Sequence, residues 1–179
     1  MKKILIASVL MMAACKEEKK ETPIHPEFPP KEVVKVENKS TESEEAKKWL
    51  ETSIENYFNS DLGSLDKEMQ RITTKDYYEY KTDAMNVDMD VDRSLTEKEF
   101  QDKWKGKFDT GKAGIGYGFL ITAQDWDKIK VSTCHLISES KTDMLFDTVL
   151  SDENLKAEYP VKIKIAKEND SFLIADVLQ

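Results

Sequence analysis

Apolar residues recur every three or four positions between residues 43 and 109, which is the spacing of one face of an α-helix. The pattern predicts a first helix that ends near residue 59, a short second helix, a third over 75–85 and a fourth that follows residue 96. The four apolar stripes consist of Ala46, Leu50, Ile54, Tyr57 and Phe58; Leu65, Met69 and Ile72; Tyr77, Tyr80 and Ala84; and Phe100, Trp104 and Phe108.

Two capping boxes mark predicted helix starts. Thr41 precedes Glu44, and Thr96 precedes Glu99, by the three residues that let hydroxyl and carboxylate each accept a backbone N–H. The aromatic residues of the last stripe form a large ridge, and we expect a β-sheet to be its packing partner.

Alternation of polar and apolar residues replaces the helical period after residue 110 and predicts five strands. Their ranges are 117–122, 128–138, 143–151, 158–167 and 171–178. In the second strand the alternation places five residues on one face: Ile129, Val131, Thr133, His135 and Ile137. Helices followed by adjoining antiparallel strands indicate an α+β domain, with helices packed on one face of a sheet.

This order of elements, with the terminal run Asp170–Val177, resembles the NTF2-like or cystatin-like superfamily over residues 43–179. The resemblance implies N-terminal helices packed on a curved, mostly antiparallel sheet of about five strands, which forms a cone with an opening. The superfamily includes enzymes such as ketosteroid isomerase and many non-enzymatic binding modules, so the resemblance does not determine function.

The first fifteen residues have the pattern of a cleavable secretory signal that ends at a cysteine. Two lysines precede an apolar run from Ile4 to Met12, and Ala13 and Ala14 come directly before Cys15. This stretch resembles the lipobox of bacterial lipoproteins. The resemblance implies that residues 1–14 are removed and that Cys15 is diacylated on sulfur and acylated on its amine.

A membrane-spanning helix is the weaker interpretation of residues 4–14. At ~1.5 Å per residue such a helix reaches only about half of the ~30 Å hydrocarbon core. A plain signal peptide would make Cys15 accidental in a chain with two cysteines. Two or more acyl chains anchor a protein stably, so we expect attachment to a membrane through lipid.

Residues 15–42 read as a disordered tether between the lipidated Cys15 and the domain. A run of charges follows the cysteine, and four of the five prolines lie here, so the segment lacks the apolar surface for a core. Lys16 stands where enteric lipoproteins retained in the inner membrane have aspartate, which points to the outer membrane. The charged start also resembles the tethers of surface-exported lipoproteins, and a plain solubilising spacer is the alternative.

The charge balance limits the classes of partner. The chain has 27 basic and 35 acidic residues, a net charge of −8, and removal of residues 1–14 leaves 25 against 35, a net charge of −10. Nucleic acid and anionic lipid headgroups require a basic surface and are therefore disfavoured, whereas a basic protein is permitted. With Cys15 lipidated, Cys134 has no disulfide partner.

One acidic stretch resembles the calcium loop of EF-hands. Oxygen-bearing residues fall at positions 1, 3, 5, 7 and 12 of that loop: Asp88, Asp90, Asp92, Ser94 and Glu99. Position 6, which calls for glycine at positive φ, is Arg93. The alternative is a solvated acidic loop, with Glu99 serving only the helix cap.

Candidates for catalysis are few, and no cofactor besides calcium is implied. His135 and Asp147 are the two titratable residues considered for the cone interior, and Cys134 leaves the strand on the face opposite His135. A ligand pocket would be lined by Tyr57, Tyr77, Tyr80, Trp104 and His135. Tyrosines on amphipathic helices more often pack against a core with a hydrated hydroxyl, which is the alternative.

The sequence therefore favours a non-catalytic, lipid-anchored binding module of the cell envelope, which contacts a small ligand or an envelope protein. Three alternatives stay open: an inhibitor or immunity-type lipoprotein that masks a basic partner, an isomerase- or lyase-type cone enzyme, and a calcium-binding structural lipoprotein.

Overall fold

Four strands form one antiparallel sheet in the order of the sequence. They are β1 (Ile129–Glu139), β2 (Asp143–Asp152), β3 (Ala157–Glu168) and β4 (Ser171–Leu178). Each strand pairs with the next across a tight connection, as antiparallel hairpins allow. β1 and β4 are the two edges, so the sheet is open rather than closed.

The structure is a computed structural model that describes residues 41–178. The predicted signal peptide, the lipidated cysteine and almost all of the predicted tether lie outside the described residues. The described domain begins two residues before the predicted start at residue 43.

The helices confirm the predicted stripes. They are α1 (Thr41–Phe58), α2 (Leu65–Ile72), α3 (Lys75–Met85) and α4 (Glu97–Trp104). Two 3₁₀ turns accompany them: η1 (Leu62–Ser64) directly precedes α2, and η2 (Thr110–Lys112) follows α4. The described part of α1 begins at Thr41, so the predicted capping box of Thr41 and Glu44 lies at the limit of the described residues and stays a prediction. Between residues 41 and 178 no helix is both long enough and apolar enough to cross a membrane.

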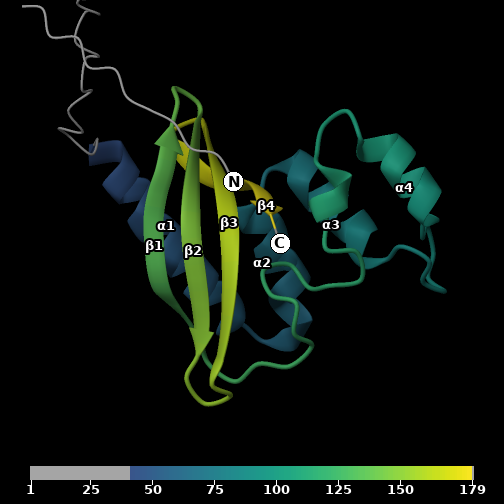
Figure 1. Cartoon of the computed structure of the whole chain (residues 1–179), viewed down its shortest axis with the longest axis horizontal. Helices are drawn as coiled ribbons and strands as arrows, with labels where there is room; N and C mark the ends of the chain where they lie inside the picture. Colours follow the sequence, from purple (N-terminus) through teal and green to yellow (C-terminus); the bar gives the residue numbers. More distant parts are fainter. Residues whose placement is uncertain (1–40, 179) are drawn as a thin grey trace, which may run out of the picture. The chain divides into compact units, whose positions relative to one another are not determined.

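α1, α2 and α3 pack against the sheet, which confirms the α+β architecture. α1 packs on β1, whereas α2 and α3 contact β4 (Figure 1). Val161, Ile163 and Ile165 of β3 point together into this layer and are at most 4% exposed, because alternate residues of a strand share one face. The core lies between this face and the helices.

The predicted strand over residues 117–122 is wrong, so the described sheet has four strands rather than about five. The segment is an irregular connection between η2 and β1. Phe119, Leu120 and Ile121 are all at most 3% exposed, whereas a strand would turn alternate side chains to opposite faces. The predicted cone with an opening is likewise not confirmed, since the four described strands form an open sheet.

A β-bulge in β1 changes which residues face the helices. The register of β1 against β2 shifts between Val131 and Thr133, so Ser132 is an extra residue on β1. One inserted residue moves the following side chains to the other face, here up to a second register shift between Leu136 and Ser138. Cys134 is therefore buried at 4% exposure, whereas His135 is exposed. The predicted common face is wrong beyond Val131.

A side chain of α1 holds the strand at this bulge. Glu55 Oε1 accepts a hydrogen bond from the backbone N–H of Val131 at 3.3 Å. β1 is an edge strand, and an edge N–H without a strand partner needs another acceptor. Glu55 thus satisfies one backbone group of the exposed edge.

The aromatic ridge packs on α3 and not on the sheet, which corrects the predicted partner. Phe108 lies beyond the end of α4, yet its ring stacks on that of Tyr80, with centroids 4.2 Å apart and an interplanar angle of 15°. The ring of Phe100 also stacks on that of Tyr80, with centroids 5.4 Å apart. Figure 1 shows α4 beyond α3 as seen from the sheet.

Candidate functional site

The two catalytic candidates are neighbours, but they lie on the uncovered face of the sheet. His135 pairs with Asp147 across β1 and β2, and Asp147 pairs with Lys162 across β2 and β3. All three residues are exposed, whereas Phe146 beside Asp147 is fully buried on the helical side. The bulge and the pleat together direct both candidates away from the core, so neither lies inside a cone.

Cys134 faces the opposite way from His135, as predicted for neighbouring residues of a strand. Burial raises the pKa of the Cys134 thiol to about 11. A nucleophilic thiol needs a lowered pKa and access to solvent, so Cys134 is a packing residue.

Four of the five pocket candidates pack in the core, and the tyrosines among them are buried more deeply than the half-buried tyrosines with hydrated hydroxyls that were the alternative. Tyr57, Tyr77, Tyr80 and Trp104 are at most 8% exposed. The Tyr80 hydroxyl donates to the Asp109 carbonyl at 3.1 Å, and Trp104 Nε1–H donates to the Asp83 carboxylate at 2.7 Å. Burial raises the pKa of Tyr57 to about 12.

These four aromatic residues and His135 line none of the five cavities described among residues 41–178. The predicted pocket therefore has no support from these cavities.

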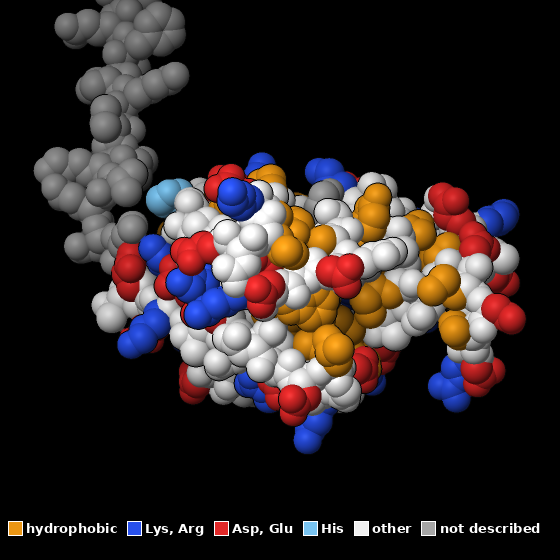
Figure 2. Space-filling model, turned by 90° about the horizontal axis from the view of Figure 1, so that it is seen from below, with side chains coloured by type: hydrophobic (Ala, Val, Ile, Leu, Met, Phe, Trp, Pro, Cys, Tyr) orange, Lys and Arg blue, Asp and Glu red, His pale blue; other side chains and the backbone are white. Residues whose placement is uncertain are grey.

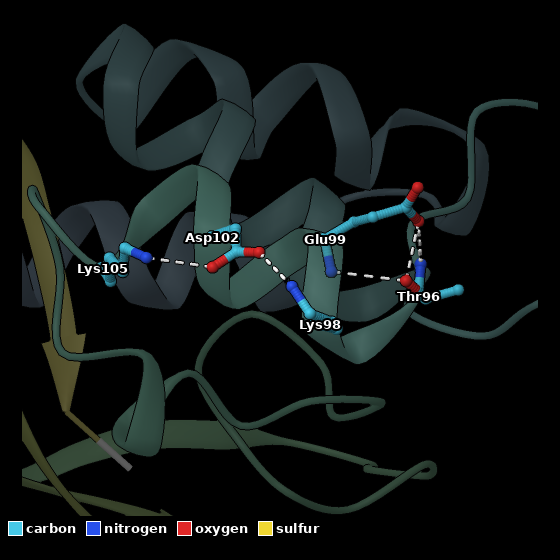
Figure 3. Close-up of polar contacts among 5 residues, drawn as sticks. All are labelled: Thr96, Lys98, Glu99, Asp102 and Lys105. Carbon is cyan, nitrogen blue, oxygen red and sulfur yellow. Dashed lines mark hydrogen bonds and ion pairs between the residues drawn. The ribbon is translucent and has the colours of Figure 1, made fainter.

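Glu99, the twelfth residue of the EF-hand-like stretch, is engaged in the helix cap. Its Oε2 accepts hydrogen bonds from the Thr96 backbone N–H at 2.9 Å and the Thr96 hydroxyl at 2.7 Å, while Thr96 Oγ1 accepts from the Glu99 N–H (Figure 3). The predicted capping box is confirmed.

Further along α4, hydrogen bonds from Lys98 and Lys105 lower the pKa of Asp102 to about 2 (Figure 3). These two ion pairs lie on the solvent-exposed side of α4.

The rest of the stretch folds as a turn held by its own hydrogen bonds. Ser94 Oγ donates to the Asn86 carbonyl at 2.6 Å and accepts from the Met89 N–H. Arg93 adopts φ = 66°, the conformation that glycine supplies in EF-hands, and Asp88 is also at positive φ.

The three aspartates are nevertheless not gathered around one point. Among residues 41–178, no three His, Cys, Asp or Glu side chains are gathered as metal ligands, so Asp88, Asp90, Asp92, Ser94 and Glu99 carry no support for a calcium site.

A groove of about 420 Å³ between α1 and α2 was missed by the sequence analysis. Its residues on α1 include Glu45, Trp49, Thr52 and Asn56, which follow the helical spacing i, i+4, i+7 and i+11. They form a second stripe beside the apolar one. Arg71 of α2 contributes to the other wall. The tryptophan within an otherwise polar stripe was the signal that could have found this groove.

Comparison with known proteins assigns no family, since no protein-family model, no curated protein and no solved structure matches the chain.

Proposed function

We propose that this protein is a non-catalytic binding module held on the cell envelope by lipid, where it contacts a small ligand or an envelope protein. The observation that carries the proposal is the cysteine directly after Ala13 and Ala14, at the end of a basic and then apolar N-terminal stretch. The mature protein is then attached to the outer membrane, facing the periplasm or the cell surface.

The anchor is tested by intact-mass spectrometry and membrane fractionation of the protein expressed in a Gram-negative host. We expect the mass of a protein that lacks residues 1–14 and carries acyl chains at Cys15, found in the membrane fraction. Globomycin should leave residues 1–14 attached to the acylated protein, and Cys15→Ala should remove the mass of the acyl chains. Cys134→Ala is the matched control and should leave the mass of cleavage and acylation unchanged, and a bare thiol at Cys15 would contradict the proposal.

A binding role is supported by the placement of the catalytic candidates. His135 and Asp147 are exposed on an uncovered sheet face, without the enclosed site in which general acid–base chemistry operates. An open groove beside Trp49 offers a concave surface of the size that small ligands occupy. A cone enzyme therefore has less support than a binding module.

The NTF2-like or cystatin-like relationship is part of this proposal. It is supported by helices that precede an antiparallel sheet and pack on one face of it. An experimental structure with an opening between helices and sheet would support it further. A sheet whose helical face is packed throughout would contradict the cone.

A second candidate is an inhibitor or immunity-type lipoprotein that masks a basic partner, which the net charge of −10 after signal removal favours. On the face drawn in Figure 2 acidic and basic side chains are interspersed around a central hydrophobic area, so the support for this candidate is the total charge. Salt-sensitive capture of a basic envelope protein would favour this candidate, and salt-independent capture would oppose it.

A further inference from the structure

Trp49 occupies the border between the core and the groove. Its ring contacts that of Phe172 in β4, with centroids 6.0 Å apart and an interplanar angle of 49°. The same indole lines the groove between α1 and α2 and is only partly buried. Packing against Phe172 limits its rotamers, so the groove has a positioned aromatic wall.

The polar residues of the groove have hydrogen-bonding capacity to spare. Within residues 41–178 the side chains of Thr52 and Asn56 make no hydrogen bond, and both are exposed. A hydroxyl and a carboxamide each donate and accept. Arg71 Nε–H donates to Glu68 at 2.8 Å, which leaves other guanidinium N–H groups for a ligand.

The charge of the groove is close to balanced. Glu45 and Lys48 carry opposite charges, and the Arg71 charge is paired with Glu68. A strongly ionic ligand would find no matching excess of charge here, and the net negative charge of the protein further disfavours an anion. The groove therefore suits a neutral ligand.

We propose that this groove binds a neutral saccharide. A sugar ring has a C–H face that packs on an indole and a rim of hydroxyls that both donate and accept, which match Trp49 and the side chains of Thr52 and Asn56. A groove of about 420 Å³ lies within the range of about 300–1,000 Å³ that ligand pockets occupy. The saccharide site rests on the proposed binding function and specifies its ligand class.

The experiment is a calorimetric titration of the full chain, solubilised through Cys15→Ala, with three neutral disaccharides: N,N′-diacetylchitobiose, cellobiose and maltose. We expect at least one to bind saturably. Trp49→Ala should weaken that binding about tenfold or more, since a truncated aromatic anchor is commonly the largest loss in a site. Asn56→Ala changes an exposed side chain and should weaken binding without altering the circular dichroism spectrum.

Two controls keep the test decisive. Trp126→Phe alters a tryptophan whose Nε1–H donates to the Phe58 carbonyl at 3.4 Å outside the groove, and binding should persist. Trp49→Phe retains a ring against Phe172 and should bind with intermediate affinity. It replaces Trp49→Ala in the test if Trp49→Ala fails to fold.

Two results would overturn the saccharide site: no saturable binding of any of the three disaccharides, or equal binding by wild type, Trp49→Phe and Asn56→Ala. Lipidation at Cys15 without saccharide binding would overturn only the saccharide site. Saccharide binding in the titration, together with a bare Cys15 thiol in the mass of the wild-type protein, would overturn only the anchor.

Discussion

Asp152 Oδ2 accepts a hydrogen bond from the backbone N–H of Asp127 at 2.7 Å, across 25 residues of sequence. The same oxygen accepts from the Lys128 N–H at 3.2 Å, and Oδ1 accepts from the N–H groups of Asn154 and Leu155. Asp152 is 1% exposed. One carboxylate thus joins the approach to β1 with the β2–β3 turn.

Replacing Asp152 by asparagine should lower the unfolding temperature by several degrees, because the amide places a donor against backbone N–H groups. Backbone hydrogen bonds, first that of Leu155, lower the pKa of Asp152, so its ionised form favours the folded state. This stabilisation is present above the unfolded pKa of about 4 and is lost as pH falls through the folded value. Asp152→Asn should therefore flatten the acid limb of thermal stability against pH.

Asp147→Asn is the matched control, since Asp147 lies in the same strand but is exposed. Equal losses of stability in the two variants would contradict a special role for Asp152.

Lys81 is 1% exposed, and its Nζ donates to the carbonyls of Ala113 at 2.8 Å and Gly114 at 3.2 Å. Desolvation lowers the pKa of Lys81 to about 8. Its ammonium ties α3 to the turn after η2, and this turn leads into the buried segment 119–121. The hydrogen bonds to these two carbonyls partly offset the unfavourable desolvation of the Lys81 ammonium.

The free energy of unfolding should rise by about 2 kcal/mol between about pH 8 and about pH 10 because of Lys81. Over this window the folded state has released the proton, whereas the unfolded lysine, with a pKa near 10.4, still binds it. Urea unfolding at several pH values measures the slope. Lys81→Met should lack the rise, and an unchanged slope in this variant would contradict the assignment.

Loss of the capping box should destabilise the start of α4. Thr96→Ala removes the hydroxyl that accepts the Glu99 N–H and should lower the free energy of unfolding by about 1 kcal/mol. Thr96→Ser keeps the hydroxyl and should stay close to wild type. Urea unfolding compares the two, and equal losses would assign the effect to the methyl group instead.

Cys134 should resist thiol reagents in the folded protein. Burial and a pKa raised to about 11 leave little accessible thiolate at neutral pH. In the Cys15→Ala chain, reaction with a disulfide reagent should be slow in buffer and complete in denaturant. Fast labelling of the folded protein would place Cys134 at the surface.

Particular elements show why some predictions were right. The α3 range 75–85 and the β4 range 171–178 were predicted at their observed bounds, and the Thr96–Glu99 box was confirmed. These features depend on hydrogen bonds and side-chain spacing within a few residues. Phe108 was expected on the helix face of Trp104, and it reaches the same cluster from beyond the helix end.

The candidate site was predicted poorly because it depends on contacts between distant segments. The extra residue Ser132 turned His135 outward, and the burial of α3 against α4 filled the expected pocket with tyrosines. Trp49 became part of a groove only because α2 lies beside α1.

By itself the sequence determined where the four helices and the four observed strands lie, the α+β class and the charge, since periodicity, caps and composition act locally or additively. Only the tertiary structure decided which face of β1 is buried, that residues 119–121 form no strand, and which aromatic ring borders a cavity. Those outcomes depend on register and on packing between segments far apart in the chain, where one inserted residue reverses the side chains that follow it.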